Sequence, residues 1–236
     1  MGPITSHAGS MLATLNMVTA SKKNAGRSES LRAIRMHPNY CLAGGEAIDL
    51  PGAHGVPPAK DLQTLDGIAD WLGRWLSELA KDADAPLVPV ARSASAMLIL
   101  RVNEQHPGLL AGVVLLSPMV PFDREHSNAD LLQRVEASRC RLNSVAFDYM
   151  QRLTDEADWD EQEDPFRGLA TLLLTGERDT QVSDRVRSRC QQWSERLPHV
   201  RFQNVRAAGH DVLNLRDREP GLVAYRSLFD FFASVR

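Results

Sequence analysis

The sequence predicts an α/β fold in which a mainly parallel sheet carries helices on both faces. Short apolar segments alternate with longer helical patterns along the 236 residues, and 43% of the residues are hydrophobic. Alternating strands and helices indicate crossover units and a parallel sheet. A chain of this length can bury a full core as one domain. We therefore predict a single domain over residues 1–236.

Six short segments have the length and the bounding Gly, Pro or polar residues that are typical of strands. They cover residues 11–16 (MLATLN), 46–50 (EAIDL), 86–91 (PLVPVA), 112–117 (GVVLLS), 170–175 (ATLLLT) and 200–205 (VRFQNV). Ligands of parallel sheets bind at the carboxyl ends of the strands. Functional residues are therefore expected where these segments end.

Apolar residues spaced by threes and fours predict a helix over residues 61–80, with one apolar stripe along it. Residues 94–102, 182–197 and 221–235 are predicted as further helices. The interval 118–168 is too long for a simple crossover, so we predict an inserted helical cap at about 119–168. Its acidic run, DEADWDEQED, is interpreted as solvated surface rather than as a feature that selects cationic substrates.

The charge balance excludes several classes of partner. The formal net charge is −3, so no basic field points to nucleic acid or to an anionic membrane surface.

The first residues, MGPITSHAGS, lack the order of a signal peptide, and no apolar run is long enough to cross a bilayer. A cytoplasmic protein with a small-molecule partner is expected by default, and its oligomeric state stays open.

Three cysteines, Cys41, Cys140 and Cys190, have neither metal-ligand spacing nor the density of a disulfide scaffold. They are expected to be reduced thiols. We predict no metal site and no cofactor.

Residues 91–95 read ARSAS, where an apolar strand meets an apolar helix. A strand that reverses directly into a helix strains the residue between them, and the residues two before and two after it must be small. Ala91 and Ser95 meet that need around Ser93, which would stand exposed as a nucleophile. Ser95 is the poorer candidate because the second residue after it is Met97.

In this segment the chain resembles the α/β-hydrolase superfamily, whose elbow is usually G-x-S-x-G. LLLTGERDTQV looks like the family's acid turn, with Asp179, and VRFQNVRAAGHDV looks like its histidine loop, with His210. AIDLPGAHG is similar to the family's D-x-P-G-x-G segment, with Ala53 as an extra residue. The resemblance spans about residues 5–236 and implies the α/β-hydrolase fold. The order Ser93, Asp179, His210 is the order expected for it.

The resemblance implies a catalytic triad. A serine hydroxyl is a weak nucleophile at neutral pH, so His210 would accept its proton and later return it to the leaving group. Asp179 would orient the imidazole and stabilise its cation. Glu177, in the same turn, is the alternative acid.

An oxyanion hole would need two backbone donors. The first would be the N–H of Ala94, and the second should come from the loop after the family's third strand. If residues 11–16 are that strand, Val18 or Thr19 supplies the donor. An alternative register uses His7-Ala8-Gly9 but leaves almost no chain for earlier strands, so we favour the first. Glycine is missing from the favoured loop and from both flanks of the elbow, which bears on catalytic efficiency.

Together these residues predict a serine hydrolase that cleaves a small carboxylic ester or thioester through an acyl-enzyme. Arg92 would either pack along its aliphatic stem or meet a substrate carboxylate. In the cap, Met119 and Trp159 would line an apolar pocket or belong to a helical core. The alternative function is a catalytically weak or inactive member of the fold that binds a small ligand in the same pocket.

Overall fold

A computed structural model of the chain describes residues 13–16, 46–49, 62, 64–81, 87–92, 95–118, 164–213 and 218–235. Within these residues, parallel strands form one sheet in the order β2-β1-β3-β4-β5-β6. The strands are β1 (Ala13–Asn16), β2 (Glu46–Asp49), β3 (Val90–Arg92), β4 (Gly112–Leu116), β5 (Ala170–Gly176) and β6 (Val200–Val205). Each lies within a predicted strand or overlaps it, so the predicted sheet is confirmed.

The strand β3 begins later than predicted. Leu87 forms only an isolated bridge, and regular pairing starts at Val90. Pro89 explains the difference, because proline has no N–H to donate to a ladder. Its carbonyl still accepts a hydrogen bond from the N–H of Val114, at 2.9 Å, which holds this segment against β4.

Four helices are described: α3 (Leu65–Lys81), α4 (Ser95–Gln105), α7 (Asp184–Arg196) and α8 (Arg218–Ser234). Local chemistry sets where two of them begin. Thr64 Oγ1 accepts the N–H of Gly67 at 3.0 Å, and Ser183 Oγ accepts the N–H of Val186 at 3.2 Å. The helix α8 begins three residues before its predicted start and includes Pro220, because the first turn of a helix tolerates proline.

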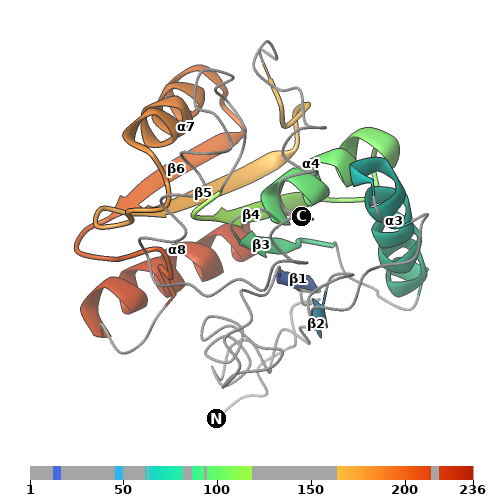
Figure 1. Cartoon of the computed structure of the whole chain (residues 1–236), viewed down its shortest axis with the longest axis horizontal. Helices are drawn as coiled ribbons and strands as arrows, with labels where there is room; N and C mark the ends of the chain where they lie inside the picture. Colours follow the sequence, from blue (N-terminus) through green and yellow to red (C-terminus); the bar gives the residue numbers. More distant parts are fainter. Residues whose placement is uncertain are drawn as a thin grey trace, which may run out of the picture.

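The helices cover both faces of the sheet, as Figure 1 shows, with α8 on the side opposite α4 and α7. Side chains of β4 alternate between the two layers: Val113 and Leu115 pack with α3, α4 and α7, while Val114 and Leu116 pack with α8. This explains why β4 is apolar at every position. Burial on both faces is typical of an interior strand of a parallel sheet, and β4 lies between β3 and β5.

Most of the predicted cap lies outside the described residues. Its last part, residues 164–168, forms a turn before β5, in which the carboxylate of Asp164 accepts the N–H groups of Phe166 and Gly168. The ring of Phe166 packs edge-on against Trp193 of α7, with 5.2 Å between ring centroids. This turn therefore belongs to the main core.

Cys190, in α7, is a free and fully buried thiol, and burial raises its pKa to about 12. Cys41 and Cys140 lie outside the described residues. None of the helices that the structure describes is both long and apolar enough to span a membrane.

Candidate active site

The acid turn follows β5 directly and is held by its own backbone. The N–H of Asp179 donates to the carbonyl of Gly176 at 3.1 Å. The carboxylate Oδ1 of Asp179 accepts the N–H groups of Gln181 at 2.8 Å and Val182 at 3.1 Å. Such local bonds from an aspartate to the backbone ahead of it are typical of turns. One carboxylate oxygen is thus used to fix the turn, and the other is left for a different partner.

The histidine loop follows β6 and is bonded to the acid turn. The N–H of Arg178 donates to the carbonyl of Ala208 at 2.8 Å, and the N–H of Ala207 donates to Glu177 Oε2 at 2.8 Å. Ala207 has a positive φ of 60°, a left-handed conformation that only a close turn imposes on alanine. These bonds carry the chain from β6 back over the end of β5.

The two loops bring His210 and Asp179 together. His210 Nδ1 lies 2.9 Å from Asp179 Oδ2, and the two side chains are 11% and 0% exposed. A carboxylate can only accept, so the proton of the imidazole lies on Nδ1 and Nε2 is free to accept another. Glu177, the alternative acid, is exposed and bonds Ala207 instead.

The same contacts set the charge state of the acid. Burial by itself raises the pKa of Asp179, but the hydrogen bond and charge of His210 and the N–H groups of Val182 and Gln181 outweigh it. The net result is a pKa below that of an ordinary aspartate. Asp179 is therefore an anion at neutral pH, as the orienting member of a triad must be.

We expect the wild type to lose more free energy of unfolding between pH 6 and pH 3 than Asp179→Asn loses. A carboxylate whose pKa is lowered by folding contributes stability that is fully present above the unfolded-state pKa, about 4. That contribution is lost as the pH falls through the lower folded-state pKa. Asparagine does not titrate, so the variant lacks this component. Urea unfolding across the pH series measures the difference, and parallel curves would contradict it.

Most of the other predicted site residues lie outside the described residues. These are Ser93, Ala94, Val18, Thr19, Met119 and Trp159. The flanks of the elbow are described: β3 ends at Arg92 and α4 begins at Ser95, so two residues separate strand from helix. Ser95 itself is fully buried in the first turn of α4.

The order of the sheet bears on the two registers considered for the oxyanion loop. The strand β1 lies between β2 and β3, so the segment MLATLN neighbours the strand that precedes Ser93. The loop that follows this strand in the favoured register, with Val18 and Thr19, lies outside the described residues. The residues His7, Ala8 and Gly9 of the other register lie outside the described residues.

Three residues near this edge were missed by sequence reasoning. Gly176 ends β5, and a Cβ there would lie 2.2 Å from the carbonyl oxygen of Gly209. Arg187 donates through Nη1 to the carbonyls of Asp179 and Val182, at 2.9 and 2.8 Å. Ser117, after β4, is fully buried with a φ of 43°. Gly176 could have been found from the sequence, because it stands between a strand and an acidic turn. The roles of Arg187 and Ser117 depend on tertiary packing.

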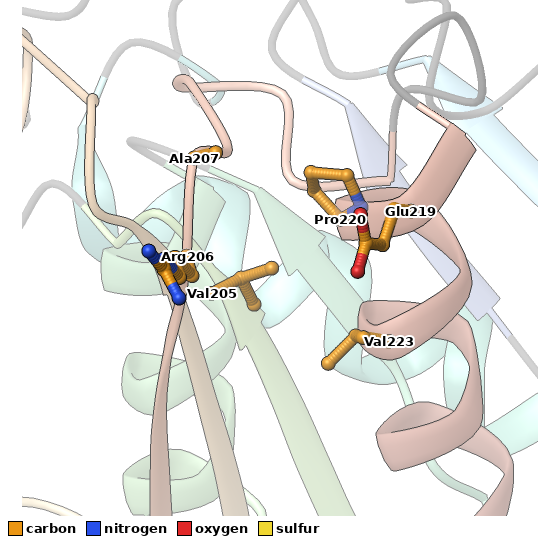
Figure 2. A pocket seen from close by; sticks show the side chains of 6 residues that line it. All are labelled: Val205, Arg206, Ala207, Glu219, Pro220 and Val223. Carbon is orange, nitrogen blue, oxygen red and sulfur yellow. The ribbon is translucent and has the colours of Figure 1, made fainter.

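A pocket of about 230 Å³ lies beside the histidine loop rather than at the paired side chains. Figure 2 shows Val205 and Val223 pointing into the gap between the end of β6 and α8, with Pro220 above them. Neither Asp179 nor His210 lines it. The described residues also include no group of three His, Cys, Asp or Glu side chains that could hold a metal ion.

No protein-family model matches the sequence, and no curated protein matches it. Solved structures do match. A putative non-heme bromoperoxidase, BpoC, from Mycobacterium tuberculosis H37Rv is 18% identical, with 97% of this chain and 93% of that chain covered and a TM-score of 0.63. A thermophilic esterase from Thermogutta terrifontis, solved with malate bound, is 14% identical, with 95% and 92% covered and a TM-score of 0.61.

MenH from S. aureus is 16% identical, with 95% of each chain covered and a TM-score of 0.59. These matches extend over nearly the whole of both chains, so the likeness concerns the complete architecture and not one motif. Such structures share the fold predicted from ARSAS and the two loops. The predicted fold class is thereby confirmed.

Proposed function

We propose that this chain, which has the α/β-hydrolase fold, is a serine hydrolase that cleaves a small carboxylic ester or thioester through an acyl-enzyme. The observation that carries the proposal is the contact of 2.9 Å between His210 Nδ1 and Asp179 Oδ2 at the carboxyl edge of the sheet. Solved structures of the same fold that are described as esterases and as a monoacylglycerol lipase support the class of reaction.

Strand order supports Ser93 as the nucleophile. Ser93 comes directly after β3, which is two strands away from β5 in the sheet, with β4 between them. Two strand spacings amount to about 10 Å. The relay covers this distance if the imidazole that Asp179 holds lies between the two residues along the edge. The three residues can therefore meet although they are far apart in the sequence.

The proposed reaction has two steps. In the first, Nε2 of His210 accepts the Ser93 proton as Oγ bonds to the substrate carbonyl, and the proton then passes to the leaving alcohol or thiol as its bond to the acyl carbon breaks. In the second, Nε2 accepts a proton from water, whose oxygen attacks the acyl carbon, and passes it to Oγ of Ser93 as the bond from Oγ to the acyl carbon breaks and the carboxylic acid leaves. The N–H of Ala94 and that of Val18 or Thr19 would stabilise the oxyanion in both steps.

We expect a fluorophosphonate probe to label the wild type and Ser93→Ala to abolish the labelling, because the probe reacts with an activated serine. Trypsin cleavage after Arg92 and Arg101 releases residues 93–101 as one peptide. Fragment ions of that peptide separate an adduct on Ser93 from one on Ser95. Circular dichroism checks that the variant is folded.

An unlabelled wild type with an intact fold would favour the alternative function, a protein that binds a small ligand without turning it over. An adduct on Ser95 would move the nucleophile by two residues and contradict the assignment of the elbow.

A further inference from the structure

Arg92 ends β3 with an unusual lack of partners for a partly buried cation. Its Nε is buried and has no hydrogen-bond partner among the described residues. The structure shows no ion pair for its guanidinium within the part of the chain that it describes. Burying a charged donor without an acceptor is costly, and proteins normally pair such groups. The residue is also next in sequence to Ser93.

Ser117 presents a second donor in the same situation. It is 0% exposed, and its Oγ has no hydrogen-bond partner among the described residues. Its backbone is left-handed, with a φ of 43°, which is strained for a residue with a side chain. The N–H of Ser117 donates to the carbonyl of Leu174 at 2.7 Å, so the strain is imposed where β4 leaves the sheet. Strain and unsatisfied polar groups concentrate at functional sites.

These two donors lie at neighbouring positions of one edge. Arg92 is paired in register with Leu116, and Ser117 is the next residue. Side chains two apart on a strand share a face, so Arg92 lies on the same face as Val90. Val90 packs in one cluster with Val212 and Leu213, which follow His210 in the chain. Arg92 therefore lies on the α8 side of the sheet, at the strand end that precedes Ser93 in the sequence.

We propose that Arg92 and Ser117 bind a carboxylate on the substrate, so that the preferred substrates are half-esters or half-thioesters of dicarboxylic acids. This inference rests on the proposed hydrolase function and adds the class of its substrate. A guanidinium meets a carboxylate with two parallel hydrogen bonds, and a carboxylate has lone pairs left for a hydroxyl. Arg92 is only partly buried, whereas Ser117 is fully buried in the free protein, so ligand contact with Ser117 requires this part of the edge to open.

Binding is tested without turnover in the Ser93→Ala protein by calorimetry, with methyl hydrogen glutarate and its uncharged analogue methyl pentanoate. We expect the half-ester to bind at least about tenfold more tightly than methyl pentanoate, because hydrogen bonds to a charged group typically contribute that much to affinity. Adding Arg92→Met should reduce that preference to less than about twofold, and adding Ser117→Ala should reduce it partly. Arg178→Met is the matched control: it removes the same charge from an exposed position of the same edge and should keep the preference.

Stability separates this role from a structural one. Arg92→Met and Ser117→Ala remove unsatisfied donors, so their Tm should be unchanged or higher, whereas structural residues would lower it. Equal binding of the two esters, an unaltered preference in Arg92→Met, or competition by inorganic phosphate as strong as that by glutarate would overturn the proposal. Fluorophosphonate labelling of the wild type stays an independent measure of the hydrolase function. A labelled protein without the preference would overturn the carboxylate site alone.

Discussion

We expect Asp179→Asn to lower kcat for a small ester by on the order of 10⁴-fold while the protein stays folded. In the wild type, Oδ2 of Asp179 accepts the Nδ1 proton of His210 and leaves Nε2 without a proton. The amide nitrogen of asparagine at the same place donates instead, so the imidazole would carry its proton on Nε2. A histidine in that tautomer cannot accept the proton of a serine. Turnover of p-nitrophenyl acetate measures the loss.

The rest of the acid turn should tolerate this change. Asparagine keeps an Oδ1 that can accept the N–H groups of Gln181 and Val182, which are the bonds that fix the turn. Glu177→Gln is the matched control, because it neutralises a carboxylate in the same turn and keeps an oxygen for the N–H of Ala207. We expect its kcat to stay within a few-fold of the wild type. A loss in Glu177→Gln that exceeds the loss in Asp179→Asn would reassign the acid.

The strands and the loops of the site could be predicted because they depend on local patterns. Apolar runs such as GVVLLS are buried on both faces, and such runs alternate with helical spacing. Parallel strands all end at one edge, so Asp179 and His210 could be expected near each other once each was placed after a strand. Their nearness follows from connectivity, whereas the contact of 2.9 Å depends on the bonds between the two loops.

The remaining features depend on contacts between distant segments. The N–H of Ser117, a residue with a left-handed backbone, donates to the carbonyl of Leu174, which is 57 positions away in the sequence. The two bonds that Arg187 donates to the acid turn depend on how α7 lies beside that turn. No local pattern encodes either one. The helix α8 begins at Arg218, three residues before its predicted start, with Pro220 in its first turn, because a proline can begin a helix as well as end one.

We expect Gly176→Ala to lower the free energy of unfolding by about 1–3 kcal/mol and to lower activity further than this loss explains. A Cβ at this position would lie 2.2 Å from the carbonyl oxygen of Gly209 and 2.4 Å from that of Ala208. Both are backbone atoms, so no side chain can rotate to make room. Pairing with β4 and β6 holds β5 in place, with Gly176 opposite Val205. The histidine loop must therefore move, and its movement separates His210 from Asp179.

Gly209→Ala is the matched control, because it adds the same methyl group beside His210. A Cβ at Gly209 meets no heavy atom within 4 Å, so this variant should keep both its stability and its activity. Thermal unfolding and kcat are measured for both variants; for a chain of this length, the expected loss in Gly176→Ala corresponds to a Tm lower by about 2–12 °C. If the close approach at Gly176 positions His210, Gly176→Ala should lose stability and activity and Gly209→Ala should lose neither. Equal effects in the two variants would mean that the loop adjusts freely, and that the pairing of His210 with Asp179 does not depend on the close approach at Gly176.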